Sequence, residues 1–193
     1  FNEEKLVKIA KAAAELGIEL FVLDDGWFGK RDDDTTSLGD WQEDRRKLPH
    51  GLAGLAKRVN DLGLKFGLWV EPEMVSPESE LYKKHPDWCL HVKGRRRTLA
   101  RNQLILDLSR QDVREYIIET FSGIFSRVPV SYVKWDMNRN MTEIGSEKWP
   151  ADRQMEIAHR YILGLYEILE RLTSAFPHIL FENCSSGGGT VRP

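Results

Sequence analysis

Apolar runs of strand length alternate with segments of helical periodicity along this chain of 193 residues, and this alternation constrains the fold more than any other feature. The runs are rich in β-branched and aromatic residues, which is typical of buried strands. They predict strands at residues 18–23, 64–70, 130–136 and 179–184, with residues 104–107 as a possible fifth. The intervening periodicity predicts helices at residues 5–16, 52–62, 78–85, 113–124 and 151–176. Strands separated by helices imply right-handed βαβ units and a parallel sheet.

Polar, aromatic and glycine-rich segments follow the ends of the predicted strands rather than precede their beginnings. Active sites of βα barrels lie at this carboxyl end of the strands. An open, doubly wound sheet binds its ligands at the same end, so the bias alone leaves both architectures open. Either way the fold class is α/β, and the length suits one domain over residues 1–193.

The segment 133–139 combines a lysine, a carboxylate, an amide and an arginine at the end of a predicted strand. Side chains at positions i and i+2 of a strand share a face, so Lys134 and Asp136 are expected to point the same way. A nearby ammonium group favours the ionised form of Asp136. An ionised, positioned carboxylate is what covalent glycosyl transfer requires of its nucleophile.

Two adjacent carboxylates, Asp24 and Asp25, follow the first predicted strand. A turn through Gly26 can aim both at one ligand, where they would accept hydrogen bonds from sugar hydroxyls. The alternative is a plain turn in which one aspartate caps the next segment. Spacing alone does not decide between these two interpretations.

Other side chains near the strand ends are candidates for binding. An indole can pack on the apolar face of a sugar ring, but a tryptophan near a strand end can equally belong to the core. The tryptophans in question are Trp27, Trp41, Trp69 and Trp135. Arg101 is a candidate for bidentate binding, and Glu71 and Glu73 are able to pair with basic residues.

The amino-acid composition limits the classes of partner that this protein is expected to bind. A net charge of −2 and a pI of about 6.3 argue against nucleic acid or an anionic membrane as partner, and no apolar run is long enough to span a bilayer. Cys89 and Cys184 lie far apart without a CxxC spacing, so we expect no disulfide framework, no metal site and no cofactor. Residues 1–5 lack a signal-peptide pattern, so we expect a cytoplasmic protein, while export stays open because the true N-terminus can precede Phe1.

Four motifs in order resemble glycoside hydrolase family 36, the bacterial α-galactosidases. They are LDDGWFG at 23–29, GLWVEPE at 67–73, KWDMNR at 134–139 and ENCSSGGG at 182–189. The resemblance implies a retaining α-galactosidase in which Asp136 matches the nucleophile. It implies α-galactosides or galactose as ligands. The positions that match the galactose subsite are Asp24, Asp25, Trp69, Arg101, Lys134, Asn138, Cys184 and Gly187.

Four or five strands are about half of the eight that a closed barrel requires. We therefore expect parallel βα units that form a half barrel of the TIM type, corresponding to roughly the second to fifth strands of the family's catalytic barrel. Such a half barrel has two open sheet edges and an uncovered apolar face, which favours a homodimer.

In the family, a second carboxylate on a later strand acts as acid/base, and this sequence ends before it. We therefore expect these 193 residues alone to hydrolyse α-galactosides very slowly. A self-associating half-barrel scaffold and a galactose-binding pseudoenzyme are the alternatives.

Overall fold

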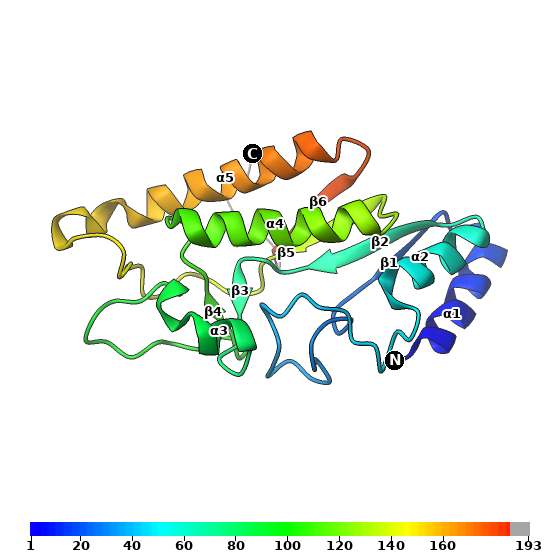
Figure 1. Cartoon of the computed structure of the whole chain (residues 1–193), viewed down its shortest axis with the longest axis horizontal. Helices are drawn as coiled ribbons and strands as arrows, with labels where there is room; N and C mark the ends of the chain where they lie inside the picture. The colour runs from blue at the N-terminus through cyan, green and yellow to red at the C-terminus, as the bar shows by residue number, and fades with distance from the viewer. Residues whose placement is uncertain (186–193) are drawn as a thin grey trace.

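Four parallel strands form the sheet of the computed structural model, which describes residues 1–185 (Figure 1). The strands are β1 (Leu20–Leu23), β2 (Lys65–Val70), β5 (Tyr132–Asp136) and β6 (Leu180–Cys184). They lie side by side in the order β1-β2-β5-β6, so each strand is hydrogen-bonded to its neighbours in chain order and all run in one direction. The expected parallel sheet of βα units is confirmed.

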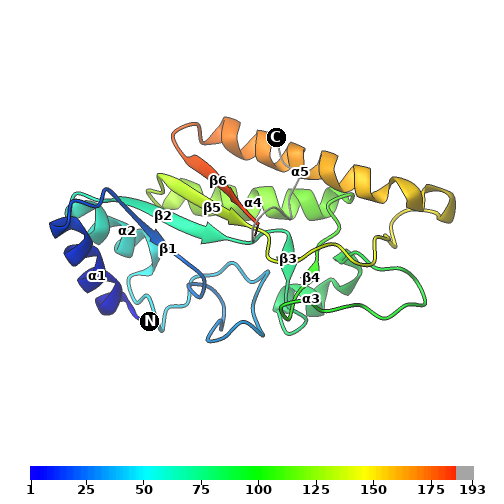
Figure 2. The same cartoon turned by 180° about the vertical axis from the view of Figure 1, so that it is seen from behind.

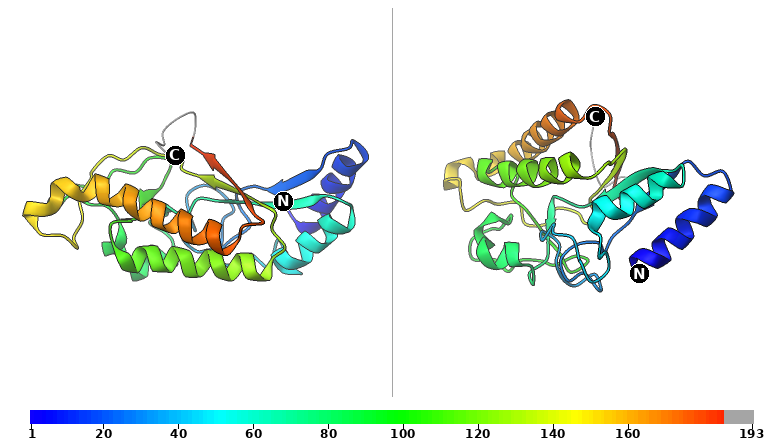
Figure 3. Two further views of the ribbon diagram at one scale, coloured as in Figure 1. Left: turned by 90° about the horizontal axis from the view of Figure 1, so that it is seen from above. Right: turned by 45° about the vertical axis from the view of Figure 1, so that its right-hand side comes forward.

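The helices that alternate with these strands cover one face of the sheet. They are α1 (Glu3–Glu15), α2 (Gly51–Asp61), α4 (Gln111–Arg127) and α5 (Ile157–Ala175). Figure 2 shows the strands β5 and β6 with α4 and α5 behind them, and Figure 3 shows α4 and α5 running next to each other. No helix among residues 1–185 is long and apolar enough to cross a membrane.

Alternation along the strands gives the two faces different side chains. On the helix-covered face the register aligns Leu23, Leu68 and Val133, whose exposed fractions are 2% or less, and Trp135 packs against Phe121 of α4. This row is the centre of the hydrophobic core.

The opposite face carries a row formed by Val22, Gly67, Tyr132 and Leu180. A Cβ on Gly67 would lie 2.9 Å from the side chain of Val22 and 3.2 Å from that of Tyr132, so these side chains share this face. Leu180 is 66% exposed, and no helix covers this side of the sheet within the described part of the chain. In a βα barrel this is the face that points to the interior.

Local signals explain where the first helices begin and end. Asn2 caps α1, because its side-chain oxygen accepts a hydrogen bond of 3.0 Å from the backbone N–H of Lys5. Gly17 and Gly63 follow α1 and α2 with φ angles of 80° and 83°, a left-handed conformation that glycine adopts without a steric penalty.

Two sequence predictions need correction. The possible fifth strand exists as β4 (Leu104–Ile105), but it pairs antiparallel with β3 (Met74–Val75) and does not join the parallel sheet. The last long helix begins as the 3-10 helix η2 (Ala151–Glu156), and α5 starts only at Ile157.

Ser109 and Asp112 have the spacing of a capping box. Instead, Arg110 is the N-cap of α4 without a side-chain cap bond, because Ser109 donates to Asp107 and Asp112 pairs with Arg110. The short elements α3 (Glu80–Lys84) and η1 (Pro86–Trp88) complete the chain.

Candidate active site

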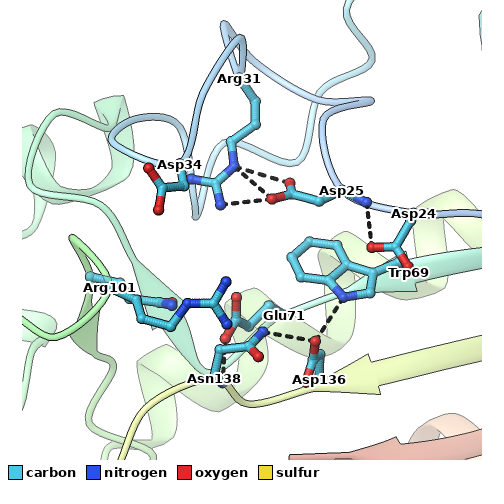
Figure 4. Close-up of a pocket in the computed structure, with 10 residues that line it drawn as sticks. Asp24, Asp25, Arg31, Asp34, Trp69, Glu71, Arg101, Asp136 and Asn138 are labelled. Carbon is cyan, nitrogen blue, oxygen red and sulfur yellow. Dashed lines mark hydrogen bonds and ion pairs between the residues drawn. The ribbon is translucent and has the colours of Figure 1, made fainter. Parts of the chain in front are cut away.

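A polar cavity of about 110 Å³ lies at the carboxyl ends of β1, β2 and β5 (Figure 4). Parallel strands in register end at the same edge of a sheet, so residues distant in sequence meet there. The residues that line it are Asp24, Asp25, Arg31, Asp34, Trp69, Glu71, Arg101, Gln103, Asp136 and Asn138.

Asp136 is the last residue of β5 and is 5% exposed. Its Oδ2 accepts hydrogen bonds from Nε1 of Trp69, at 3.0 Å, and from Nδ2 of Asn138, at 2.7 Å. Its Oδ1 accepts one of 2.9 Å from the backbone N–H of Met137. Three donors therefore fix the orientation of this carboxylate.

Lys134 lies two residues earlier on the same face but forms its ion pair with Asp24. The distance from its Nζ to Oδ2 of Asp24 is 3.1 Å. Burial lowers the pKa of Lys134, but the hydrogen bond and charge of Asp24, with smaller contributions from Cys184 and Asp136, raise it overall. The sequence predicted Lys134 as the charge next to Asp136; the structure makes Asp24 its direct partner.

Asp25 is held by a different cation. Nη2 of Arg31 lies 2.8 Å from its Oδ2, and Nε donates to both of its carboxylate oxygens. The turn between Asp24 and Asp25 continues through Gly26, whose φ of 102° suits glycine. The turn therefore directs both aspartates to one cavity, as the ligand-binding interpretation expected.

Glu71 follows β2 and is 1% exposed. Its Oε1 accepts a hydrogen bond of 2.6 Å from the backbone N–H of Asn138 instead of pairing with a basic side chain. Burial raises the pKa of Glu71 to about 7; the backbone bond from Asn138 opposes this shift, and the charge of Asp136 adds to it. Near neutral pH this side chain is therefore present both as carboxylate and as acid.

A tight turn brings Arg101 to the cavity. Arg101 and Asn102 have φ angles of 50° and 60°, a left-handed conformation that costs energy for residues other than glycine. Buried Arg139 holds the turn, because its Nη1 donates to the carbonyl oxygens of Thr98 and Gln103, at 2.8 Å each.

The structure brings most of the predicted site residues together. Six line the cavity, namely Asp24, Asp25, Trp69, Arg101, Asp136 and Asn138. Lys134 contacts the cavity through Asp24, and Cys184 lies beside Asp136 in the strand register without lining the cavity. Gly187 lies outside the described residues.

The other tryptophans belong to the core. Trp27 is 0% exposed, Trp135 is 1% exposed and Trp41 is 5% exposed. Trp27 nevertheless supports the site, because its Nε1 donates to the carbonyl oxygen of Trp69 at 2.9 Å.

Sequence reasoning missed Arg31, Asp34 and Gln103 as lining residues. They lie in loops, where no periodicity indicates which way a side chain points. Arg31 pairs with Asp25, six residues earlier, although Asp32 is next to it in the sequence, so spacing did not indicate this ion pair. Among residues 1–185, no group of three or more His, Cys, Asp and Glu side chains is arranged to hold a metal ion.

Comparison with known proteins identifies the family. Residues 1–193 match the melibiase protein family. The chain belongs to this family. It is 69% identical over 193 residues to α-galactosidase AgaA of Geobacillus stearothermophilus, which covers 100% of this chain and 26% of that protein. It is 57% identical over 189 residues to α-galactosidase 1 of Pediococcus pentosaceus, covering 98% of this chain and 26% of that protein.

Solved structures of melibiase relatives share the fold. The crystal structure of the GH36 α-galactosidase AgaA superposes with a TM-score of 0.96 at 70% identity, over 98% of this chain and 26% of that one. The expected α/β class, partial TIM barrel and α-galactosidase resemblance are thereby confirmed. The chain spans about a quarter of the length of these relatives.

The chemistry available to this melibiase cavity follows from its side chains. Asp136 offers an oriented carboxylate oxygen, while Asp24 and Asp25 offer acceptors for hydroxyl groups. Arg101 makes no ion pair within the described residues, so its guanidinium can donate to a ligand. Such a set of groups suits a neutral, hydroxyl-rich molecule.

Proposed function

We propose that this chain carries the nucleophile and most of one galactose subsite of a retaining α-galactosidase. The observation that supports this most directly is Asp136, a buried carboxylate oriented by Trp69 and Asn138 inside a cavity rimmed by further carboxylates. Variants of the relative AgaA have been crystallised with raffinose and with stachyose. We assign galactose contacts to the eight positions matched above, including Cys184 and Gly187.

In the proposed step, a carboxylate oxygen of Asp136 attacks the anomeric carbon of an α-galactoside. The bond from that carbon to the leaving oxygen breaks, and its electron pair goes to the leaving oxygen, which then needs a proton. By resemblance to the family, we expect the proton donor on a later strand of the barrel. Residues 1–193 alone are therefore expected to be nearly inactive, except on substrates whose leaving group departs without a proton.

An activated substrate tests this proposal. The chain should release nitrophenol from p-nitrophenyl α-galactoside slowly, and Asp136→Asn should abolish the release because the amide is not a nucleophile. Asp61→Asn, an exposed aspartate at the end of α2, is the matched control and should behave as wild type. Turnover that Asp136→Asn leaves unchanged would rule out the assignment, and turnover equal to that of a full-length relative would rule out the need for a later acid.

A galactose-binding protein without turnover is the second candidate, and the preserved cavity favours it. Calorimetry separates the two. Heat of binding for galactose or melibiose without nitrophenol release supports the binding protein. Absence of both contradicts both candidates.

The open sheet supports a further proposal, a homodimer through the sheet edges. Within residues 1–185, β1 and β6 each pair with one strand only, and the uncovered face presents Leu180. A second copy could cover this face. Sedimentation would show a dimer at micromolar concentration, and a stable monomer would exclude it. The cytoplasmic location and the single domain over residues 1–193 stay predictions.

A further inference from the structure

Two buried glutamates follow β2, and they have different surroundings. Glu73 is 0% exposed and accepts hydrogen bonds from Nε1 of Trp135, at 2.9 Å, and from the hydroxyl of Tyr161, at 2.6 Å. It thus joins β5 to α5 in the core. Glu71, with the same chemistry and nearly the same burial, lines the cavity instead.

A chain of two hydrogen bonds connects Glu71 to the proposed nucleophile (Figure 4). The carboxylate of Glu71 accepts from the backbone N–H of Asn138, at 2.6 Å, and Nδ2 of Asn138 donates to Oδ2 of Asp136, at 2.7 Å. The other donor to that oxygen, Trp69, comes from β2 as well. Both donors to Oδ2 are therefore positioned by one strand, Trp69 as part of it and Asn138 through Glu71.

We propose that Glu71 is a positioning residue for the nucleophile, because its carboxylate fixes the backbone of Asn138 and thereby the amide group that orients Oδ2 of Asp136. This inference deepens the proposed function and rests on it for the role of Asp136. Without the acceptor at residue 71, the segment after β5 loses the contact that holds Asn138 over the carboxylate. A small displacement there matters, since nucleophilic attack depends on alignment within about 0.5 Å.

The charge of Glu71 makes this contact pH-dependent. A carboxylate accepts a stronger hydrogen bond from an N–H than the neutral acid does. The pKa of Glu71 is about 7, raised first by burial, so the bond to Asn138 strengthens as pH rises through neutrality. The charges that face Glu71 are those of Asp136 from β5 and of Arg31 from the loop after β1. The same cavity is lined by the further charged groups of Asp24, Asp25, Asp34 and Arg101.

Three variants of the full chain separate the effect of the hydrogen-bond acceptor at residue 71 from the effect of its charge. Glu71→Gln keeps a carbonyl oxygen that can accept from Asn138 but has no charge to titrate. Glu71→Ala removes the acceptor. Glu73→Gln makes the same chemical change at the neighbouring buried glutamate, which bonds to Trp135 and Tyr161, and is the control.

The measurement is the backbone amide of Asn138, followed by NMR without ligand. In wild type, its proton shift should titrate with a midpoint of about 7, in step with the carboxyl carbon of Glu71. Glu71→Gln should keep the resonance near its wild-type position and abolish the titration, whereas Glu73→Gln should leave both unchanged. In Glu71→Ala, hydrogen exchange of this amide should become roughly tenfold faster or more.

Two results would overturn the inference: a titration of the Asn138 amide that persists in Glu71→Gln, or exchange that Glu71→Ala leaves unchanged. If Glu71→Ala does not fold, the titration in Glu71→Gln decides.

Ligand binding is measured in a separate experiment. Wild type should bind 1-deoxygalactonojirimycin, and Glu71→Ala should weaken this binding more than Glu71→Gln does. Wild type that binds no ligand yet shows the Asn138 titration would contradict the proposed function and leave the positioning role of Glu71 supported.

Discussion

The carboxylates of this cavity have different roles because their hydrogen-bond and ion-pair partners differ. Asp136 is oriented by two side-chain donors and one backbone N–H, whereas Asp25 is neutralised by Arg31. Asp24 forms an ion pair with Lys134 and is largely exposed. Glu71 is buried beside Asp136, and burial raises its pKa although Asn138 donates to it.

The raised pKa of Glu71 predicts how stability changes with pH. The ordinary value is 4.5 and the folded value is about 7, so the unfolded chain loses its proton first as pH rises. The contribution of Glu71 to the free energy of unfolding is therefore complete below pH 4.5, falls between 4.5 and about 7, and is lost above that. The total loss is about 3 kcal/mol at 1.36 kcal/mol per pKa unit.

Urea unfolding at pH 4.5 and pH 8 checks this prediction. The free energy of unfolding should fall by about 3 kcal/mol more in wild type than in Glu71→Gln over this range. Asp40 and Asp107 also have raised pKa values, caused mainly by burial, but they are present in both proteins and cancel in the difference. Equal pH dependence in the two proteins would contradict the assignment.

At the residue scale, the sequence predicted those side-chain positions that the register of the strands determines. Asp136 and Trp69 meet in one cavity because residues at the ends of neighbouring parallel strands lie close together, although for Trp69 the spacing alone left a core position open. It could not predict that Lys134 pairs with Asp24, since both carboxylates are within reach of a flexible ammonium and only the three-dimensional arrangement decides. Arg31 was missed because the loop after β1 has no repeating pattern that indicates a direction.

At the scale of elements, two glycines in long helices have opposite surroundings. Gly164 of α5 lies against the backbone before α4, and a Cβ there would be 2.1 Å from the carbonyl oxygen of Leu108. Gly123 of α4 is exposed, and a Cβ there would meet nothing within 4 Å. Only the first glycine is required by packing.

Alanine substitutions test this difference. Gly164→Ala should destabilise the protein by about 1–3 kcal/mol, because α5 must move away from Leu108. Gly123→Ala should stabilise it by up to about 1 kcal/mol, because alanine loses less conformational entropy in a helix. Thermal unfolding of both variants checks the prediction. A destabilised Gly123→Ala, or an unaffected Gly164→Ala, would contradict it.

The elements themselves were largely predictable because period-2 and period-3.6 patterns follow from burial. The pairing of β3 with β4 was not, since each is only two residues long and their contact joins segments that are distant in sequence. The start of α4 was also missed, because Ser109 bonds to Asp107 rather than to the helix. Short polar side chains have several backbone and side-chain partners within reach, and local spacing does not choose among them.

At the scale of the whole molecule, the sheet is covered on one side only. The helix-covered face forms the core, while the row that contains Val22, Tyr132 and Leu180 faces outward in this chain. Apolar edge strands with an uncovered face favour association.

A charge at this surface should weaken the proposed dimer. Leu180→Lys places an ammonium on β6 where the side chain is 66% exposed, and it should raise the dissociation constant by roughly tenfold or more through lost apolar burial. Met155→Lys is the control, because Met155 is 96% exposed on η2, away from the sheet. Sedimentation equilibrium of both variants checks the prediction, and equal association would locate the interface elsewhere.

The strand order β1-β2-β5-β6 also has a consequence for how the chain is made. After β1, each parallel strand can pair at once with a strand that the ribosome has already released. The sheet can therefore grow at a single edge during synthesis, one βα unit at a time. At every stage the newest strand is the growing edge, and it is the surface on which a further strand would add.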